Sequence, residues 1–489
     1  MADTKIYSAR TVFEGLKKTF HQYLEAQYHI WDEGLIAERS RLLGRPGVSF
    51  QEPLLESTPF YTSGKPYQKL AIPKPAQEIL ILASGRPNVG IYTEPYSHQS
   101  AALEAFLGRD EEIIVATGTG SGKTESFLMP ILGSLAVESA QRPESWNLPG
   151  VRALLVYPMN ALVNDQLGRL RRLIGDAEVA KALKGKRERR ATFGMYTSRT
   201  PYPGKSTLSK DNERIGKLLE QLFQGLSPEN QLLLEREGKW PAKDLARFVE
   251  ASFSTGPEDS ELFSRQEMQT VCPDLLVTNY SMLEYMLLRP IERSIFEQTA
   301  QWLASSSENR FIVVLDEAHM YRGSGGAEVA YLLRRLHSRL GADRKQVRYI
   351  LTSASLGQSA EAHRRVKLFA ADLTGLEHSS RGFNLITGEV NKKPGARPAT
   401  VSEARALAEY DFTTLHNIYE SIAPAEEALR QLLSNLGATI PQNRLDEVSL
   451  RHTINDWLRT FGPAALAANL VTSRPRRLEV GNRFHCIIK

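Results

Sequence analysis

The 489-residue chain has only two cysteines, Cys272 and Cys486, which lie far apart in the sequence. Two thiols exclude a framework of several disulfides, and they exclude a zinc site with four cysteine ligands within this chain. Unpaired thiols are typical of proteins in a reducing compartment, so we expect a cytoplasmic location.

Long apolar runs are also missing. No run approaches the roughly 18 residues that a membrane-spanning helix needs, and the first ten residues, MADTKIYSAR, lack the apolar segment of a secretory signal. We therefore expect no membrane partner. Apolar residues make up 42% of the chain and charged residues 24%, a composition that indicates ordinary globular domains with hydrophobic cores.

The chain has little net charge, because its 61 Lys and Arg residues nearly balance its 56 Asp and Glu residues. The small basic excess is concentrated in one stretch. Residues 181–217 hold 11 basic and three acidic residues, a net charge of +8, so the remainder of the chain sums to −3. Such a concentration of charge is typical of a surface that faces phosphates, and it favours a nucleic-acid partner.

Short apolar runs alternate with helical patterns through the middle of the chain. The runs are EEIIVAT, VRALLVYP, ATFGMYT, DLLVTNY, FIVVLDEA and RYILTSASL. Near-continuous apolar strands separated by helices are typical of a parallel sheet covered on both faces, so the predicted fold class is α/β. Phosphate sites in such folds lie at the carboxyl ends of the strands.

The predicted organisation has five segments. A helical N-terminal extension precedes the sheet domain, which is interrupted by a helical insertion between two strands and followed by a mostly helical connecting region. Amphipathic stretches such as RIGKLLEQLFQGL and PAKDLARFVEASF indicate the insertion. The predicted bounds are 1–90 for the extension, 91–202 and 270–375 for the sheet domain, 203–269 for the insertion and 376–489 for the connecting region.

The strongest motif is TGTGSGKT, Thr117–Thr124, which follows a strand and opens a helix as a P-loop does. Its glycines let backbone N–H groups turn towards phosphates, while Lys123 reaches the terminal phosphates and Thr124 binds Mg²⁺. The alternative is a chance glycine-rich turn. The predicted ligands are ATP and Mg²⁺, and the predicted nucleotide-binding residues are Thr119, Gly120, Ser121, Gly122, Lys123 and Thr124.

A second motif, VVLDEAH, ends an apolar strand with two adjacent carboxylates. Asp316 is predicted to hold the metal ion, and Glu317 is predicted to orient and deprotonate the attacking water. We thus expect Lys123, Asp316 and Glu317 to be catalytic. The alternative for the acidic pair is an ordinary acidic helix N-terminus.

Two shorter motifs accompany these. In YSHQ the Gln99 amide both donates and accepts, which suits an adenine edge, although a polar helix start is equally compatible. In TSAS the hydroxyls at a strand end can hydrogen-bond the carboxylate loop, although an ordinary turn of serine and threonine is locally the more frequent structure.

Strand–helix junctions in YPMNAL and VTNYSML place Asn160, Thr278 and Asn279 where they can bind phosphates; helix N-capping is the alternative. In GMYTSRTPY, Arg199 stands with aromatic residues beside the basic stretch, which favours contact with a nucleic acid. A solvated basic surface is the alternative there.

These motifs, in this order, resemble those of superfamily-two DEAD/DEAH-box helicases. Within residues 92–357 the sequence of the motifs is similar to that of the MrfA/YprA-type DNA helicases and to that of the large helicases of phage-defence systems such as Druantia. The resemblance implies a RecA-like P-loop domain in which Gln99 recognises adenine. It also implies that His319, Ser353 and Ser355 couple hydrolysis to movement, and that Asn160, Thr278 and Asn279 contact the DNA backbone.

Such helicases carry a second RecA-like domain that supplies arginine fingers from a Q-x-x-G-R-x-x-R-type motif, and no such motif follows residue 357. We therefore expect this chain to be the N-terminal part of a larger protein. The predicted function is an ATP-dependent DNA helicase or translocase in phage defence or repair, acting on single-stranded or tailed duplex DNA. The alternative is a nucleotide-gated DNA-binding or recruitment module with a protein partner in a defence complex.

Overall fold

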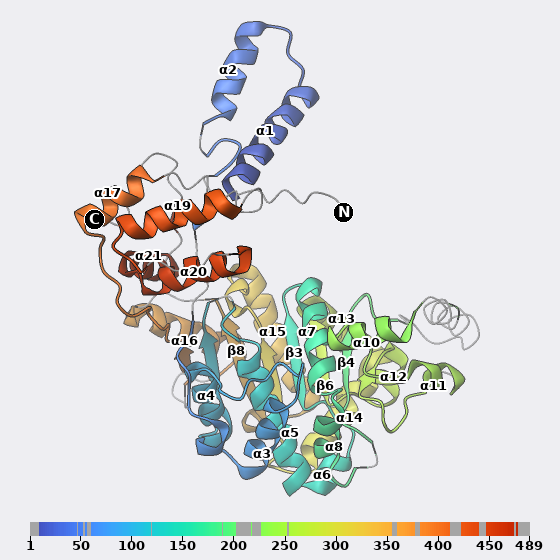
Figure 1. The fold of residues 1–489 in the computed structure, drawn as a ribbon. Helices are drawn as coiled ribbons and strands as arrows, with labels where there is room; N and C mark the ends of the chain where they lie inside the picture. The colour runs from blue at the N-terminus through green and yellow to red at the C-terminus, as the bar shows by residue number, and fades with distance from the viewer. Residues whose placement is uncertain are drawn as a thin grey trace. The chain divides into compact units, whose positions relative to one another are not determined.

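The structure is a computed structural model, and the residues that it describes form two compact units (Figure 1). The sheet unit spans Tyr61–Val390, and the terminal unit combines Met1–Phe60 with Asn391–Lys489. Each unit is described by itself. The described residues are 9–45, 47–51, 54–55, 60–118, 120–187, 189–201, 217, 226–251, 254–354, 359–376, 382–410, 422–439, 446–473 and 476–477.

The sheet unit is built on an eight-stranded sheet with the order β5-β4-β6-β3-β7-β8-β2-β9. Every pairing between neighbouring strands is parallel, which confirms the predicted α/β class. The strands are β2 (Ile113–Ala116), β3 (Ala153–Tyr157), β4 (Phe193–Tyr196), β5 (Glu261–Leu262), β6 (Leu275–Asn279), β7 (Phe311–Leu315), β8 (Val347–Ser353) and β9 (Asn384–Thr387).

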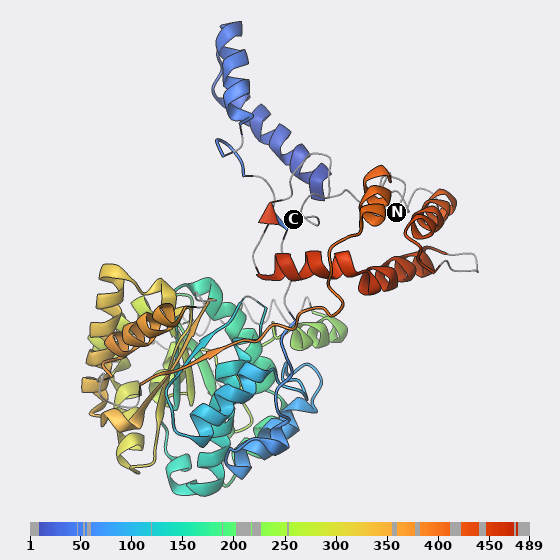
Figure 2. The same cartoon turned by 90° about the vertical axis from the view of Figure 1, so that its left-hand side faces the viewer.

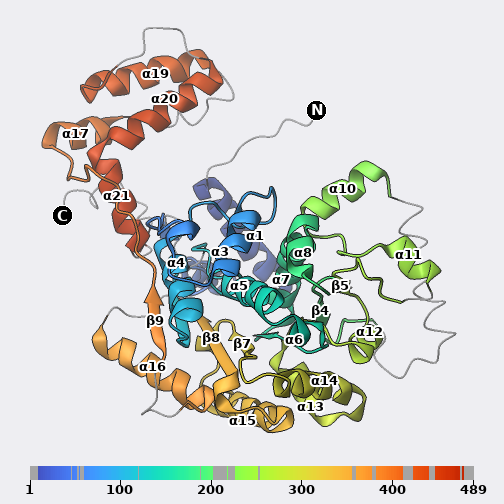
Figure 3. The same cartoon turned by 90° about the horizontal axis from the view of Figure 1, so that it is seen from below.

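Helices cover both faces of this sheet, as the view along it shows (Figure 3). On one face lie α3 (Lys74–Ser84), α4 (Ser97–Leu103), α5 (Glu125–Gln141), α7 (Asn160–Leu173) and α8 (Ala177–Lys184), with α6 (Pro143–Asn147) following α5. On the other face lie α12 (Arg265–Thr270), α13 (Tyr280–Leu288), α14 (Arg293–Ala304), α15 (Gly323–Leu340) and α16 (Ala360–Thr374).

The strands are apolar at consecutive positions because successive side chains enter opposite cores. In β2, Ile113 and Val115 belong to the core under α3 and α5, whereas Ile114 belongs to the core under α15 and α16. Leu155 and Leu154 of β3 divide in the same way. Burying both faces gives each central strand two layers of apolar contacts.

Local signals set the helix ends. Asp176 caps α8 by accepting hydrogen bonds from the N–H groups of Glu178 and Val179, and Ser359 caps α16 through Ala362. At the other end, Gly341 follows α15 with a φ of 57° and Gly375 follows α16 with a φ of 74°, a left-handed conformation that favours glycine.

The sheet unit extends further than the predicted range 91–375 at both its N-terminal and its C-terminal end. The helix α3 was expected in the N-terminal extension, yet it packs on α5 in the core. The strand β9 was expected in the connecting region, yet it pairs with β2 and forms the sheet edge. Four residues with a single buried apolar side chain, Ile386, carry too little periodicity to reveal such a strand.

Between β4 and β6 the chain forms α10 (Pro228–Arg236), α11 (Leu245–Glu250), β5 and α12. Trp240, Leu245 and Phe248 form a small core of their own in this insertion. The strand β5 pairs with β4, so the predicted helical insertion also contributes the edge strand opposite β9. Most of the stretch RIGKLLEQLFQGL lies outside the described residues.

The described part of the terminal unit is mostly helical, as predicted (Figure 2). One short antiparallel pair, β1 (Leu54–Leu55) with β10 (Arg476–Arg477), joins its two chain segments. The strand expected over NRFHCIIK lies outside the described residues. Across the described ranges, no helix combines the length and the apolarity that crossing a membrane requires. The helices are α1 (Ala9–Gln27), α2 (Glu33–Leu43), α17 (Val401–Glu409), α19 (Ile422–Asn435), α20 (Glu447–Thr460) and α21 (Gly462–Ser473).

Candidate functional site

The predicted motifs converge at the carboxyl ends of three neighbouring strands. The glycine-rich loop follows β2, the acidic pair follows β7, and the hydroxyl cluster ends β8, which lies between them. Because parallel strands present their carboxyl ends along the same edge, residues that are 194 positions apart in the sequence meet there.

The glycine-rich loop has the backbone that its glycines allow. Gly120 and Gly122 have φ values of 74° and 73°, and a side chain at Gly122 would clash with Nε2 of Gln99. The hydroxyls of Thr117 and Ser121, 2.6 Å apart, close the loop at its base. Thr119 lies outside the described residues.

Side chains of the YSHQ motif form hydrogen bonds with the backbone of this loop. Nε2 of His98 lies 2.9 Å from the Ser121 carbonyl, and burial lowers the pKa of His98, which favours a neutral ring. Gln99 donates to the Gly122 carbonyl at 3.1 Å and accepts from the N–H of Tyr96 at 2.9 Å. The Gln99 amide, only 7% exposed, is thus engaged by the chain itself.

Tyr61 is a supporting residue that the sequence did not reveal. Its hydroxyl accepts a 3.2 Å hydrogen bond from the N–H of Gly118, and its ring packs against Tyr96 and His98. Burial raises the pKa of Tyr61, so the phenol stays protonated. It stands 57 residues before Gly118, in a Pro/Gly-rich segment without a motif, and only the folded chain brings the two together.

Lys123 and Glu317 form the central ion pair of the site. Nζ of Lys123 donates to Oε1 of Glu317 at 3.0 Å. Glu317 has a φ of 49°, a left-handed conformation that is rare for a residue other than glycine and that redirects the chain directly after the strand. Nδ1 of His319 lies 3.2 Å from Oε2 of Glu317 and 3.4 Å from the hydroxyl of Ser353.

Asp316 is buried and is tied to the next strand by Thr352. The Thr352 hydroxyl donates to Oδ1 of Asp316 and accepts from the N–H of Glu317 at 3.2 Å. Burial raises the pKa of Asp316, and the Thr352 hydrogen bond opposes that rise. The hydroxyl cluster thus contacts the carboxylate loop, as the sequence suggested, through Thr352 and Ser353; Ser355 lies outside the described residues.

The donor set fits a nucleotide phosphate chain and a hard metal ion. The left-handed backbone at Gly122 disfavours any side chain there, Lys123 supplies a cation, and Thr124 and Asp316 supply oxygen ligands of the kind that Mg²⁺ prefers. The Thr124 hydroxyl lies 3.5 Å from Nε2 of Gln166, which comes from α7 on the next strand connection.

The residues predicted to contact DNA meet at the ends of β3 and β6. Nδ2 of Asn279 donates to Oδ1 of Asn160 at 2.6 Å, and Oδ1 of Asn279 caps α13 by accepting from Met282. Thr278 is fully buried, and its hydroxyl donates to the Tyr196 carbonyl at 2.7 Å. This hydroxyl therefore holds β6 to β4, and the contact of Thr278 with DNA stays a prediction.

The basic stretch also differs from its predicted form as a phosphate-facing surface. Arg187 is 4% exposed and donates to both carboxylate oxygens of Asp274 at 2.9 and 3.0 Å. Lys184 and Arg190 both pair with Glu258. Acids from distant segments therefore neutralise these three cations, whereas the Arg199 side chain is exposed.

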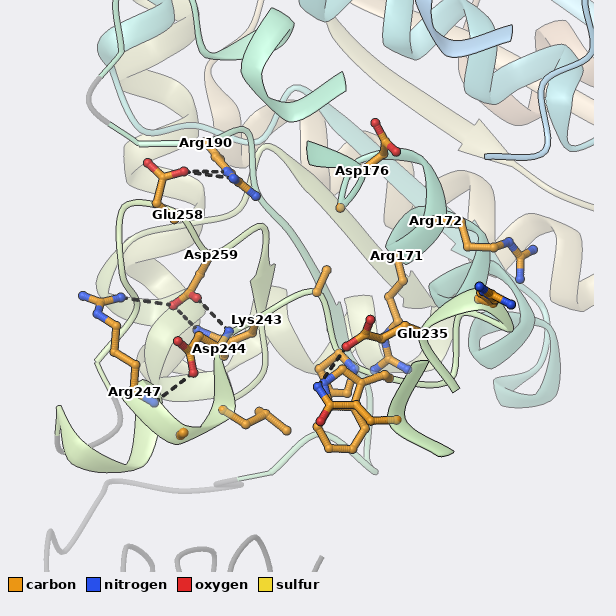
Figure 4. Close-up of a pocket in the computed structure, with 18 of the residues that line it drawn as sticks. Arg171, Arg172, Asp176, Arg190, Glu235, Lys243, Asp244, Arg247, Glu258 and Asp259 are labelled. Carbon is orange, nitrogen blue, oxygen red and sulfur yellow. Dashed lines mark hydrogen bonds and ion pairs between the residues drawn. The ribbon is translucent and has the colours of Figure 1, made fainter. Parts of the chain in front are cut away.

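A cavity of about 1130 Å³ lies where the insertion meets α7 and α8 (Figure 4). Its charged walls are bound to one another: Arg190 pairs with Glu258 at 2.9 Å, and Lys243 pairs with Asp259 at 3.0 Å. The Arg190–Glu258 pair attaches the insertion to the segment before β4, whereas the Lys243–Asp259 pair lies within the insertion.

Comparison with known proteins places this site in context. Residues 96–201 match the DEAD/DEAH box helicase family. The chain is 47% identical over 496 residues to Druantia protein DruE of Escherichia coli (strain UMEA 4076-1), covering 96% of this chain and 27% of that protein. It is 22% identical over 341 residues to the ATP-dependent helicase YprA of Bacillus subtilis (strain 168), covering 69% of this chain and 33% of the relative.

Among solved structures, the DUF1998 helicase MrfA bound to DNA matches with 18% identity and a TM-score of 0.38, covering 91% of this chain and 55% of that one. The sequence matches confirm the resemblance that the motifs predicted. They also show that the chain spans only about a quarter to a third of the length of these two curated relatives.

Proposed function

Because this chain carries a DEAD/DEAH-box helicase domain, we propose that it is the nucleotide-binding lobe of an ATP-dependent DNA helicase or translocase. One observation carries the proposal: Lys123, Asp316 and Glu317 meet at one edge of the sheet, with the lysine and Glu317 3.0 Å apart. A cation for phosphate beside two carboxylates is the donor set that phosphoryl transfer to water requires.

In this proposal different groups of the chain bind the nucleotide, activate the water and hold the metal ion. The loop amides and Lys123 bind the phosphates of ATP, and Glu317 orients the attacking water and accepts its proton. Thr124 and Asp316 would hold Mg²⁺, which when bound neutralises phosphate charge. Gln99 keeps the loop in place, and its remaining amide N–H would contact the base.

The coupling residues fit the same scheme. His319 lies between Glu317 and Ser353, so a movement of the Glu317 carboxylate would be transmitted through His319 to the end of β8. The DNA backbone would be contacted by Asn160 and Asn279, which follow the neighbouring strands. Arg199, on the turn after β4, would contact it as well. Phosphate contacts make binding independent of sequence and sensitive to salt, so affinity should fall steeply as salt rises.

This chain covers 27% of the DruE length, and in this proposal the other parts of the motor lie outside it. Arginine fingers contribute on the order of 10³–10⁵ in rate in related phosphoryl-transfer sites, so the isolated lobe should bind ATP but turn it over slowly. The 47% identity to Druantia protein DruE supports a role of the full protein in phage defence.

The test is ATP hydrolysis by the full-length protein with and without single-stranded DNA, beside a Glu317→Gln variant. DNA-stimulated turnover that the variant loses by at least about 10²-fold supports the motor. Retention of defence activity by Glu317→Gln in cells would instead support the alternative, a nucleotide-gated recruitment module without its own motor activity.

A further inference from the structure

Three large apolar side chains stand exposed beside the proposed DNA contacts. Met159 is 50% exposed, Tyr280 is 36% exposed and Met320 is 49% exposed. They follow β3, β6 and β7, which are neighbours in the sheet in the order β6-β3-β7. Exposed single apolar residues are common on protein surfaces, but here three of them share one edge with the proposed contact residues.

A hydrogen bond and a ring contact link these three positions. Asn160, which follows Met159, is hydrogen-bonded to Asn279, which precedes Tyr280. The ring of Tyr280 then meets the ring of Tyr321 edge-on, with centroids 6.4 Å apart, and Tyr321 follows Met320 directly. The three exposed side chains therefore come from positions that lie close together along the strand ends.

The same stretch carries exposed positive charge. Arg322 follows Tyr321 directly, and its residue is exposed. Arg199 is also exposed, on the turn after β4, where the Thr278 hydroxyl reaches Tyr196. Cations at both ends of an aromatic and thioether surface match a strand that has phosphates on one side and bases on the other.

We propose that Tyr280, flanked by Met159 and Met320, is a platform on which an unpaired base of single-stranded DNA stacks. This inference rests on the proposed DNA-binding function and adds base contacts to its phosphate contacts. Aromatic rings accept every base because each base has a π-face, and a methionine thioether is polarisable enough to pack against its edge. The platform would thus hold single strands without selecting a sequence.

The test compares two probes and three variants of the 489-residue chain by fluorescence anisotropy at constant salt. The probes are a short oligothymidylate and an abasic oligonucleotide of the same length, which keeps the phosphates and lacks the bases. The variants are Tyr280→Ala, Tyr280→Phe and, as a matched control, Tyr285→Ala. Tyr285 lies on the same helix and is 57% exposed, but it is more than one turn further from the strand end.

Stacking on aromatic side chains contributes about 1–3 kcal/mol per base, so Tyr280→Ala should weaken oligothymidylate binding by about 5- to 150-fold. Its affinity for the abasic probe should stay at the wild-type value, and Tyr280→Phe and Tyr285→Ala should bind both probes as the wild type does. An equal loss on both probes, or no loss on oligothymidylate, overturns the platform while leaving the DNA-binding function in place. Failure of the wild type to bind either probe overturns both.

Discussion

Nζ of Lys123 lies 3.0 Å from Oε1 of Glu317, so the cation of the glycine-rich loop and the acid of the DEAH motif neutralise each other, although β8 separates their strands β2 and β7. Both side chains are partly exposed, at 14% and 25%. A phosphate that enters the loop would compete with the carboxylate for the lysine. Nucleotide binding would then release Glu317 to face the attacking water.

Thr352 should set the acid limit of activity, because its hydroxyl contacts the Asp316 carboxylate and the backbone N–H of Glu317. Thr352→Val keeps the shape but removes the hydrogen bond that opposes the raised pKa of Asp316, so that pKa rises further. Since Asp316 must be ionised to hold a metal ion, the acidic limb of the pH–rate profile of the full-length protein should move to higher pH. Turnover should fall by about 5- to 150-fold, the equivalent of 1–3 kcal/mol for a lost hydrogen-bond partner.

Thr374→Val is the matched control, because Thr374 is equally buried and its hydroxyl donates to Ala370 within α16. It should leave the acidic limb unchanged. A Thr352→Val profile that coincides with the wild-type profile would show that the hydroxyl has no part in the charge state of Asp316.

Asp274 should be a main determinant of the stability of the sheet unit. It is fully buried and accepts from Arg187 and from the N–H of Thr192. Burial raises the pKa of this carboxyl, but the nearby Arg187, Arg189 and Arg152 outweigh burial and hold the pKa well below the usual range. Asp274→Asn leaves a buried guanidinium without its charge partner, so urea unfolding should show a loss of about 3–5 kcal/mol.

An exposed ion pair provides the comparison. Glu258 is 60% exposed at its side chain and pairs with Lys184 and Arg190, so Glu258→Gln should cost about 1 kcal/mol or less. The low pKa of Asp274 also means that its stabilising contribution is present above the ordinary pKa of aspartate and is lost as the pH falls below it. Equal effects of the two substitutions would contradict this account.

His337 should weaken the fold in mild acid. Burial, with nearby Arg344 and Arg334, lowers its pKa from 6.5 to about 4, and Nε2 lies 2.7 Å from the Tyr349 hydroxyl. The unfolded chain therefore binds a proton below pH 6.5 that the folded chain takes up only near pH 4, so stability falls between these two values.

His337→Gln keeps a donor and an acceptor near Tyr349 but does not titrate. Its unfolding temperature, measured from pH 7 to pH 4 by circular dichroism, should fall less steeply than that of the wild type. Parallel curves for the two proteins would show that His337 does not contribute to the acid response.

Local motifs were enough to predict the α/β class and the groups of the site that act directly after a strand. Lys123 and Glu317 were predicted from short patterns, because a P-loop and an acidic strand end need only their own neighbours. The ion pair of Arg187 and the hydrogen bond of Thr278 could not be predicted, since their partners Asp274 and Tyr196 come from elsewhere in the chain. Tyr61 was missed for the same reason.

The most direct test of the central claim is the binding of ATP with Mg²⁺ to this chain, measured by isothermal titration calorimetry for the wild type, Lys123→Ala and Glu317→Gln. A hydrogen bond from a charged donor contributes about 1.5–3 kcal/mol, so Lys123→Ala should bind at least about tenfold more weakly. Glu317→Gln should bind as tightly as the wild type or more tightly, because the lysine no longer faces a carboxylate. Equal affinity of Lys123→Ala and the wild type would contradict the assignment of this edge of the sheet as the nucleotide site.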